Sequence, residues 1–418
     1  MQTKRSSILP VVSCLVIMIC VGILYLWSVF RSPIMKSFDW SPESATMVSS
    51  FMLFAFCAGN LFGGILNDRR GPRLTAVAGV ILFSVGIGLT AFLTKATINW
   101  MYLTYCVLGG LGSGFAYAAC ISCVQKWLPH RKGLASGLSV SAFAFSTVVF
   151  TPVSQALMAS FSTDGVVDFK PVFLTLASVF LVLGLIATLF VRLPKAEYLK
   201  ALPQAPVSAR IFTGRDFTLL EAIKKPTFWL IFIELLFING TWTLSVPLIK
   251  NLGMTRGLSE SAAILVVSLT GVFNAGGRLI MAAVSDKLGR TTTIIILSVL
   301  TFIGAVFMIL NAQGAGFVLA ICIIAFGYGG PASINAAFTT DFFGPKNSGT
   351  NYGVIMLALG FSSLLLNTIS AYFLQGDVTR TYIMAAASAL VPVLLMFLVK
   401  SRVKKIRDEA VTLVKSSA

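Results

Sequence analysis

The chain has 418 residues, of which 56% are hydrophobic and only 11% are charged, and its formal net charge at pH 7 is +17. Soluble globular proteins carry about 25% charged residues, so this composition excludes an ordinary soluble domain and indicates a protein with many membrane-spanning segments. The positive charge does not indicate nucleic-acid binding, because the basic residues stand in short loops between apolar runs. We therefore expect membrane lipid as the surroundings and no nucleic-acid partner.

Apolar runs of about 20 residues recur along the whole chain, which is the length that a helix needs to cross a hydrocarbon core about 30 Å thick. The alternation of apolar and polar residues that is typical of outer-membrane strands is absent from the sequence. No small-residue cleavage site follows the first run, and we interpret it as a retained helix rather than a signal peptide. The pattern predicts an all-α membrane protein with twelve transmembrane helices, at 9–30, 46–66, 74–93, 99–123, 134–157, 171–191, 227–249, 259–284, 292–311, 315–337, 350–373 and 381–399.

The basic residues predict the orientation of these helices. With the N-terminus inside, 24 of the 32 lysines and arginines fall in cytoplasmic segments, seven fall outside, and the remaining one, Arg278, lies within a span. Because cytoplasmic loops carry the lysine and arginine excess, we predict that both termini are cytoplasmic. We expect an integral protein of the bacterial cytoplasmic (inner) membrane, and we interpret the basic tail as a lipid-facing topology signal.

A polar segment with three prolines separates the first six spans from the last six. Such a composition is typical of a linker. The motif Asp68-Arg69-Arg70-Gly71 returns 218 positions later as Asp286-Lys287-Leu288-Gly289. Two related halves that both begin inside indicate parallel repeats, which predict a central cavity with a midplane site. The predicted parts are an N-terminal six-helix bundle, a cytoplasmic linker, a pseudo-symmetric C-terminal six-helix bundle and a basic cytoplasmic tail, at 1–192, 193–225, 226–400 and 401–418.

One basic side chain, Arg278, lies deep inside the eighth predicted span. It precedes Asp286 by eight residues, which places it about 12 Å from the end of the span and close to the midplane. Asn274 lies one turn earlier on the same face and can orient the guanidinium or bond a substrate oxygen, while Gly276 and Gly277 are expected to allow close helix packing. Because a central arginine costs roughly 3 kcal/mol on insertion scales, it needs a partner or a cavity. Two interpretations stay open: an ion pair that only orders the bundle, or a guanidinium that binds a carboxylate through two parallel hydrogen bonds.

A second charged residue, Glu234, lies about 12 Å into the seventh predicted span. Low-dielectric surroundings favour the neutral form of a carboxyl, so Glu234 is a candidate for proton coupling. The alternative is that it caps polar groups between helices.

The sequence favours neither metal nor nucleotide chemistry. All seven cysteines fall in apolar runs, and an odd number there is no disulfide framework. Cys120 and Cys123 lack further plausible ligands, and we interpret them as packing residues and predict no metal site. No Gly-x4-Gly-Lys-Ser/Thr loop is present, so ATP-driven transport is not indicated.

The stretch from Gly64 to Arg73 resembles the loop signature of the major facilitator superfamily, and residues 286–290 resemble a weaker second copy. The second copy has Ala282 in place of the leading glycine and Thr291 in place of the final base. The resemblance implies two six-helix bundles and gating loops, whose aspartate accepts hydrogen bonds and whose glycine allows a tight turn. The alternative is that these loops only maintain topology. The implied gating residues are Asp68, Arg69, Gly71, Arg73, Asp286, Lys287, Gly289 and Arg290.

More specifically, the chain is similar from end to end to the oxalate/formate antiporter family, which also contains monocarboxylate transporters. The motifs that carry this resemblance are Gly22, Tyr25 and Trp27 with Pro33; Tyr117 before the stretch 126–137; Asn274 and Arg278 before 285–290; and Asp341 to Gly344 before Asn351 to Gly353. The resemblance implies that Tyr25, Tyr117 and Tyr328 face Arg278 between the halves. Each tyrosine by itself is also typical of ordinary packing or of a membrane interface.

Departures from the family pattern narrow the expected substrate. Leu359 stands where oxalate transporters of this family have a second buried cation, Met356 stands in place of an aromatic residue, and Phe143 replaces a tyrosine. With one cation, a doubly charged oxalate would leave one carboxylate desolvated without a partner. Relatives in eukaryotes have an aspartate where this chain has Asn274, so that route for a proton is not expected here.

Together these observations predict a secondary transporter of small monocarboxylates, such as lactate or pyruvate, that works as a proton symporter by alternating access and as a monomer. We expect no enzymatic activity, no catalytic residues and no cofactor. The alternatives are a carboxylate exchanger of the oxalate/formate type, a non-transporting membrane sensor of a metabolite, and drug efflux, which a lone buried cation suits less well. The candidate substrate-binding residues are Arg278, Asn274, Tyr117, Tyr328, Tyr25, Phe143, Leu359 and Met356.

Overall fold

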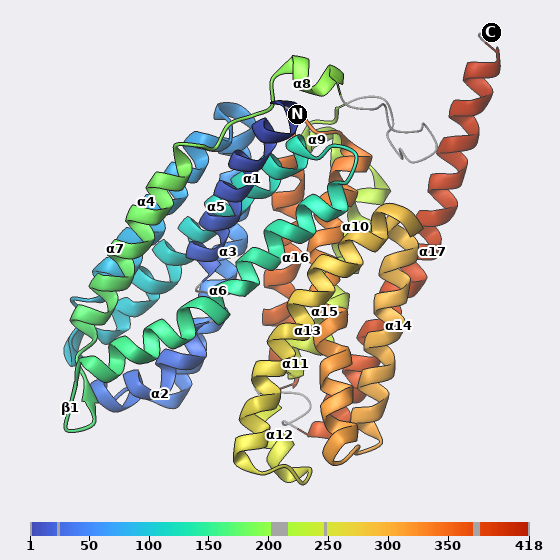
Figure 1. Ribbon diagram of the computed structural model, residues 1–418. Coiled ribbons are helices and arrows are strands. Elements are labelled where there is room, and N and C mark those ends of the chain that lie inside the picture. The colour runs from blue at the N-terminus through green and yellow to red at the C-terminus, as the bar shows by residue number, and fades with distance from the viewer. Residues whose placement is uncertain (1, 23–25, 202–215, 246–248, 371–376, 417–418) are drawn as a thin grey trace. The chain divides into compact units, whose positions relative to one another are not determined.

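The structure is a computed structural model, and it describes the chain except residues 1, 23–25, 202–215, 246–248, 371–376 and 417–418 (Figure 1). Helices dominate the described part. In chain order the elements are α1 (Gln2–Val21), α2 (Trp27–Phe38), α3 (Pro42–Arg70), α4 (Pro72–Thr90), the 3₁₀-helix η2 (Lys95–Trp100), the π-helix η3 (Tyr102–Gly109), α5 (Gly110–Trp127), α6 (Lys132–Ser160), β1 (Ser162–Thr163), β2 (Val166–Val167), α7 (Phe169–Thr188), α8 (Ala196–Ala201), α9 (Leu219–Ala222), α10 (Pro226–Ile238), α11 (Gly240–Ser245), α12 (Ile249–Thr255), α13 (Glu260–Leu288), α14 (Arg290–Ile309), α15 (Gly314–Phe343), α16 (Ser348–Thr368) and α17 (Val378–Ser416).

Eleven helical segments in the described part of the chain are long and apolar enough to cross a membrane. They coincide with the second to twelfth predicted spans. At the first predicted span, 9–30, the structure has a shorter apolar helical segment, Ile8–Val21, and α2 begins separately at Trp27. The all-α membrane fold class is confirmed.

The seventh predicted span is divided at Asn239. There α10 ends and α11 begins at Gly240, although Pro226–Ser245 together is long enough to cross a membrane. The buried Asn239 amide donates to the carbonyl of Leu235 at 2.5 Å. Asparagine side chains that bond nearby backbone compete with the helical ladder, which accounts for a break at this residue.

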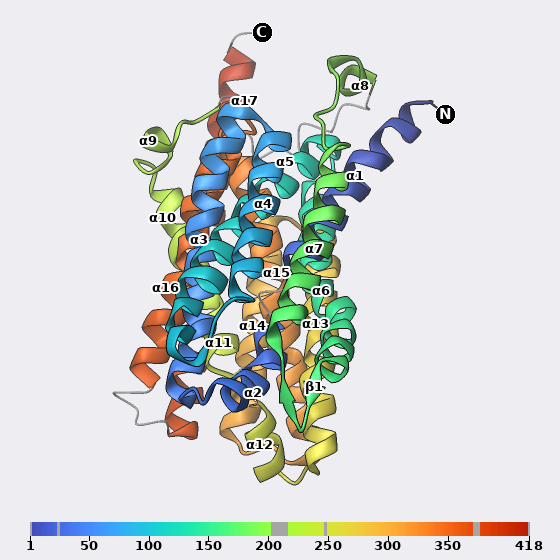
Figure 2. The ribbon, with the colours of Figure 1, turned by 90° about the vertical axis from the view of Figure 1, so that its left-hand side faces the viewer.

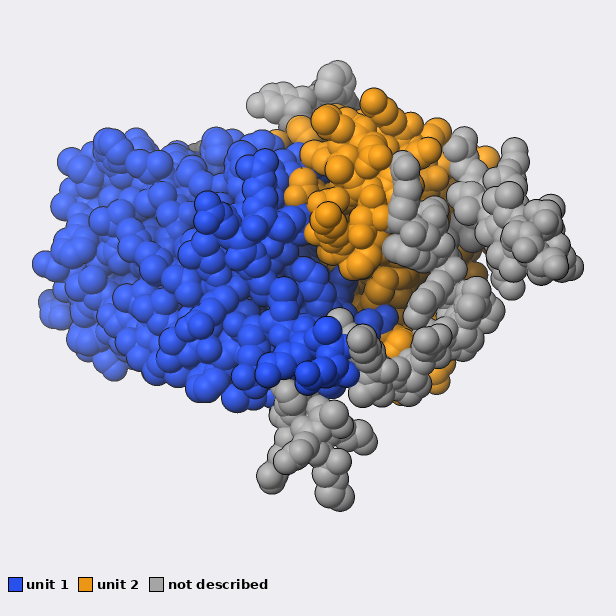
Figure 3. Space-filling model, turned by 90° about the horizontal axis from the view of Figure 1, so that it is seen from above, with its two compact units in different colours: residues 1–129, 138–202, 352–360 blue, residues 130–137, 203–351, 361–418 orange. Residues whose placement is uncertain are grey.

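The chain divides into two compact units (Figure 3). Unit 1 comprises Met1–Pro129, Leu138–Leu202 and Tyr352–Gly360. Unit 2 comprises His130–Gly137, Pro203–Asn351 and Phe361–Ala418. The start of α6, residues 132–137, thus belongs to unit 2, and the middle of α16, residues 352–360, belongs to unit 1.

In unit 1, α3 and α5 lie side by side (Figure 2) and meet backbone to backbone. A Cβ atom at Gly63 would come within 2.5 Å of the Cα atom of Phe115, and one at Gly114 would collide with the carbonyl of Phe56. Small residues permit such an approach and the van der Waals contact that holds membrane helices together. Aromatic rings also contribute to the core of unit 1; for example, the ring centroids of Phe83 and Phe180 are 5.5 Å apart.

In unit 2, a hydrophobic core gathers around Phe317 of α15, together with residues of α11, α12, α13, α16 and α17. Next to this core, the buried Arg256 side chain donates hydrogen bonds to the carbonyls of Met308 and Ala312 at 3.0 and 3.3 Å. Its guanidinium also lies 5.8 Å from the centre of the Phe317 ring. A cation at a helix C-terminus satisfies carbonyls that have no partner within the helix and complements the helix dipole, so Arg256 stabilises the end of α14.

The sequence repeat is accompanied by a repeated turn. Gly71, between α3 and α4, has φ 85°, and Gly289, between α13 and α14, has φ 88°. The hydroxyls of Thr75 and Thr293 donate to the carbonyls of these glycines at 3.0 and 2.9 Å. Because a positive φ at this value is strained for residues with a Cβ atom, glycine is needed at both turns.

Helices α13 and α15 of unit 2 pack closely along their length. A Cβ atom added to Gly277 would collide with the carbonyl of Phe326, and one added to Gly329 would collide with the carbonyl of Asn274. The neighbouring Gly276 differs, because the nearest atoms to its Cβ position are 4.0 Å away. Of the two glycines expected to allow close packing, Gly277 makes the tight approach and Gly276 does not.

This difference gives a matched test of the helix crossing. We expect Gly277→Ala to lower the midpoint of thermal unfolding of the purified protein, because overpacking of this kind costs about 1–3 kcal/mol. Gly276→Ala is the control and should leave the midpoint nearly unchanged. Equal midpoints for the two variants would contradict the close crossing of α13 and α15.

Candidate functional site

Arg278 lies on α13 in unit 2 and is almost fully buried, with 4% of its surface exposed. Its Nε–H donates to the Oδ1 atom of Asn274 at 2.8 Å. The two residues are four positions apart, so they lie one above the other on the same helix face. This geometry is the predicted pairing, and it fixes the plane of the guanidinium.

Tyr328 of α15 extends this group. The guanidinium carbon of Arg278 is 5.9 Å from the centre of the Tyr328 ring, a distance within the range of cation–π attraction. On another side, the ring of Trp242 from α11 stacks on Tyr328 with centroids 5.3 Å apart and an interplanar angle of 21°. Trp242 was not among the predicted residues, because its approach depends on how α11 packs against α15.

The glycine crossing explains why these side chains meet. Gly329 follows Tyr328 directly and lies against the Asn274 carbonyl, so the two backbones nearly touch at this level. A larger residue at Gly329 would collide with the Asn274 carbonyl and force the two backbones apart at this level. Arg278, Asn274, Tyr328 and Trp242 therefore form one group, which we call the arginine group.

Two other predicted residues, Tyr117 and Phe143, lie in unit 1 and contact each other. Their ring centroids are 5.3 Å apart, in an edge-to-face arrangement. Phe56 of α3 completes the cluster, with centroids 5.1 Å from Tyr117 and 5.4 Å from Phe143. All three rings are buried, with Tyr117 edge-to-face against both phenylalanines and the two phenylalanine rings tilted by 35° to each other, an arrangement typical of aromatic packing.

The predicted residues of span 11 also lie in unit 1. Met356 and Leu359 are both buried on α16, with 1% and 6% of their surface exposed. Tyr25, the last of the predicted substrate residues, lies outside the described residues. Of the eight predicted substrate residues, the structure brings Arg278, Asn274 and Tyr328 together.

Glu234 of α10 is fully buried in unit 2. Its Oε2 atom accepts a hydrogen bond from the Nδ2 atom of Asn335 on α15 at 2.8 Å. The Oε1 atom of Glu234 and the Oδ1 atom of Asn335 have no hydrogen-bond partner among the residues that the structure describes. Asn335 was not predicted, since it lies 101 residues further along the chain.

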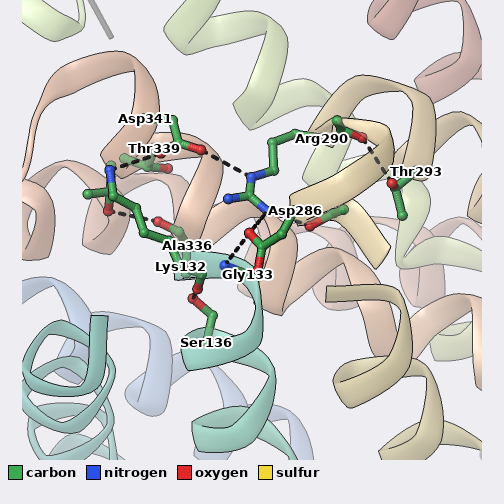
Figure 4. A network of polar contacts seen from close by, with 12 residues as sticks. Lys132, Gly133, Ser136, Asp286, Arg290, Thr293, Ala336, Thr339 and Asp341 are labelled. Atoms are coloured by element: carbon green, nitrogen blue, oxygen red, sulfur yellow. Dashed lines mark hydrogen bonds and ion pairs between the residues drawn. The ribbon is translucent and has the colours of Figure 1, made fainter. Parts of the chain in front are cut away.

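A charged network joins the start of α6 to α13, α14 and α15 (Figure 4). The two carboxylate oxygens of Asp286 accept from the backbone N–H groups of Gly133 and Leu134 at 2.9 and 3.0 Å. A carboxylate at this position satisfies N–H groups of the first helical turn and complements the helix dipole. Asp286 thus caps α6 from a different helix.

Arg290 links this cap to a second carboxylate. It pairs with Asp286 at 2.6 Å and with Asp341 at 3.1 Å, and Lys132 pairs with Asp341 at 2.9 Å. The four side chains are 8–20% exposed and alternate in charge. Gly133 makes the approach possible, because a Cβ atom there would collide with the carbonyl of Ala282. In the sequence Asp341 and Lys132 stand out only as members of motifs, and nothing there predicts a pairing across 209 residues.

The remaining predicted loop residues differ in their surroundings. Lys287, Arg69 and Arg73 are exposed. Gly71 and Gly289 form the repeated turns. Asp68 is partly buried near the end of α3, where it accepts a hydrogen bond from the Asn67 amide at 3.3 Å.

No group of three or more histidine, cysteine, aspartate or glutamate side chains within the described ranges is arranged to hold a metal ion. Cys120 and Cys123 are both buried, and neither forms a disulfide.

The sequence is similar to those of known membrane transporters along most of its length. It is 26% identical over 86% of this chain to the MFS-type transporter YhjX of Escherichia coli (strain K12), covering 87% of that protein. It is 24% identical over 84% of the chain to the oxalate:formate antiporter of Oxalobacter formigenes, covering 81% of that protein. It is also 25% identical over 91% of the chain to apicoplast pyruvate carrier 1 of Toxoplasma gondii, covering 85% of that protein.

The fold has a counterpart among solved structures. The outward conformation of the transporter FucP superposes with a TM-score of 0.72 at 12% identity, over 94% of this chain and 99% of that chain. At this identity the likeness concerns the fold alone. The family model described as Major Facilitator Superfamily matches residues 12–366 and 241–413. The resemblance inferred from the loop motifs is thereby confirmed, and the chain belongs to the Major Facilitator Superfamily.

Proposed function

We propose that this chain is a secondary transporter of small monocarboxylates, such as lactate or pyruvate, and that it moves the anion together with a proton by alternating access. The observation that carries the proposal is the arginine group. Arg278 is 4% exposed in a helix that is apolar enough to cross a membrane, and Asn274 fixes its orientation through Nε.

The chemistry of this group favours a carboxylate. A guanidinium presents further N–H donors on its two terminal nitrogens, and their planar fork matches the two oxygens of a carboxylate. Asn274 and Tyr328 are neutral groups, so their contacts orient the cation without cancelling its charge. The relatives that are an oxalate:formate antiporter and a pyruvate carrier support a carboxylate as cargo.

The size and charge of the acid follow from what surrounds the cation. Tyr328 offers ring surface beside Arg278, and Trp242 stacks on Tyr328, which suits a short apolar or hydroxylated body. The family position for a second cation holds Leu359, and a second carboxylate would have no cation to match it. A singly charged acid therefore fits better than oxalate.

The surroundings of the protein are part of the proposal. We place both termini on the cytoplasmic side of a bacterial inner membrane, because the lysine and arginine excess falls in the loops on that side. We propose a monomer that performs no bond chemistry. The charged network of Asp286, Arg290, Asp341 and Lys132 serves as a gate contact that holds α6 in one state of the transport cycle.

Removal of the cation tests the binding role directly. We expect Arg278→Ala to weaken pyruvate binding by roughly a hundredfold, because truncating one partner of a buried charged pair costs about 2–5 kcal/mol. Uptake of labelled pyruvate into proteoliposomes is the measurement. The exposed Arg380→Gln variant is the control for loss of a positive charge. Uptake that survives in Arg278→Ala would overturn the proposal.

The charge of the substrate can be tested separately by ligand-induced thermal stabilisation. We expect pyruvate and lactate to raise the unfolding midpoint of the purified protein more than oxalate at equal concentration, since binding to the native state stabilises it by mass action. Arg278→Ala should show no shift with any of the three acids. A larger shift with oxalate would identify a dicarboxylate carrier instead.

The gate contact makes a different prediction. The Asp286→Asn variant replaces the carboxylate with a neutral amide. One N–H of the first turn of α6 then loses its charged acceptor, and Arg290 loses one of its ion pairs. Hydrogen bonds to charged groups contribute about 1.5–3 kcal/mol to stability. We expect a lower unfolding midpoint and slower pyruvate exchange, because the contact that holds the start of α6 is weakened while the arginine group keeps all its side chains. Lys287→Gln, at the adjacent exposed position, is the control. Identical behaviour of the two variants would leave the network without a gating role.

A further inference from the structure

The pair formed by Glu234 and Asn335 stands apart from the arginine group and from the charged network. It joins α10 to α15 inside unit 2, and both side chains are 0% exposed. A single hydrogen bond of 2.8 Å runs from the Asn335 amide nitrogen to Oε2 of Glu234. Each residue keeps one oxygen, Oε1 or Oδ1, without a partner in the described structure.

This arrangement is poor for a permanent carboxylate. An ionised carboxylate has room for about four hydrogen bonds, and an unpaired buried charge costs several kcal/mol. The single amide donor of Asn335 supplies only one of these hydrogen bonds. A neutral carboxyl needs much less, so the pair suits a group that exchanges a proton.

Asparagine is suited to serve both forms of the carboxyl. Its amide offers two N–H donors on one side and a carbonyl acceptor on the other. When Glu234 is ionised, the Asn335 N–H donates to it, as in the structure. When Glu234 is protonated, its O–H can donate to Oδ1 of Asn335 after the amide rotates by half a turn.

The other titratable groups on the helices that pack against α10 are bonded elsewhere or lie further along their helices. Asp341 is neutralised by Lys132 and Arg290, and the Tyr382 hydroxyl donates to Ser245 at 3.2 Å. None of these groups makes a hydrogen bond to Glu234 within the described part of the chain. Among the residues whose side chains the structure describes, the titratable and charged groups concerned are Cys322, Tyr328 and Asp341 on α15 and Arg380, Tyr382 and Lys400 on α17; α11 has none.

We propose that Glu234 and Asn335 form the proton-binding site of the transporter, in which Glu234 takes up and releases one proton and Asn335 is the positioning residue that serves both states. This inference rests on the proposed function, because it assigns the coupled proton of that function to a place in the fold. The proton enters on Glu234 from one side of the membrane and leaves from the same carboxyl to the other side. Monocarboxylate and proton then move together with no net charge.

The primary test uses the full chain in proteoliposomes with labelled pyruvate and an imposed pH gradient, acid outside. We expect the wild-type protein to accumulate pyruvate and Glu234→Gln to lose at least about nine-tenths of that accumulation. Exchange of internal for external pyruvate, which needs no net proton movement, should stay within about twofold of wild type. Retained exchange also shows that the variant is folded.

A second variant tests Asn335 by a measurement that a purely structural role would not change. Asn335→Leu removes the one donor to the ionised carboxylate, so Glu234 should hold its proton more tightly by about tenfold, which moves the pH midpoint of uptake upward by about one unit. Asn239→Leu is the control, because Asn239 is equally buried but bonds the Leu235 carbonyl. Its midpoint should match that of wild type.

The outcomes separate the two proposals. If wild-type protein neither binds nor exchanges pyruvate, the proposed function fails. If it exchanges pyruvate but Glu234→Gln still accumulates it in the pH gradient, or if Asn335→Leu keeps the wild-type midpoint, the assignment of the proton fails alone. Accumulation that requires a sodium gradient in place of a pH gradient, or exchange without any accumulation, also overturns the assignment.

Discussion

The organisation of unit 2 depends on the cost of placing a charged group among apolar helices. Such a group loses its hydration and must be met by hydrogen bonds or by opposite charge. Arg290 is met by two carboxylates that the protein itself supplies, Asp286 and Asp341. Arg278 is oriented by an amide and a ring, and Glu234 by one amide. The Arg290 arrangement is a network of ion pairs, whereas the Glu234 carboxyl keeps one oxygen without a hydrogen-bond partner in the described structure and is suited to a proton that arrives and leaves.

How far the sequence predicted these groups depends on whether their partners are local. The pairing of Arg278 with Asn274 follows from helical spacing, and the structure contains it. The spans were predicted from the lengths of the apolar runs. This criterion accounts for the agreement between eleven predicted spans and eleven helical segments, and for the missed helix break at Asn239. A side chain that interrupts a helix by bonding its own backbone leaves no trace in hydrophobicity.

Contacts between distant helices could not be predicted in the same way. Trp242 stacks on Tyr328, and Asn335 bonds Glu234, because of how α10 and α11 pack against α15. Neither residue type is unusual in a membrane helix, so no pattern in the sequence singled them out. Family resemblance supplied both Tyr328 of unit 2 and Tyr117 of unit 1, and the contacts of Tyr117 with Phe56 and Phe143 could not be read from the motif. A shared motif identifies a position and does not specify what the side chain touches.

The two copies of the loop motif show how one backbone turn can carry different chemistry. Gly71 and Gly289 have nearly the same φ, and the following helices begin at Pro72 and Arg290 respectively. Proline suits the first turn of a helix but has no charge to offer, and the basic residue of the first copy follows one position later, at exposed Arg73. In the second copy the base stands at the first helical position, where it reaches two aspartates.

The same helix connects this network to the arginine group. Asp286 and Arg278 are eight residues apart on α13, which corresponds to about 12 Å along a rigid rod. The start of α6 packs along that interval: Gly133 lies against the Ala282 carbonyl, and Gly137 would place a Cβ atom 2.8 Å from the Arg278 carbonyl. Two sites become energetically coupled when both bias the position of one element. In the proposed cycle that element is the start of α6, because Asp286 caps it and the backbone of Arg278 supports it. A carboxylate that shifts α13 at Arg278 would therefore act on the gate contact without touching it.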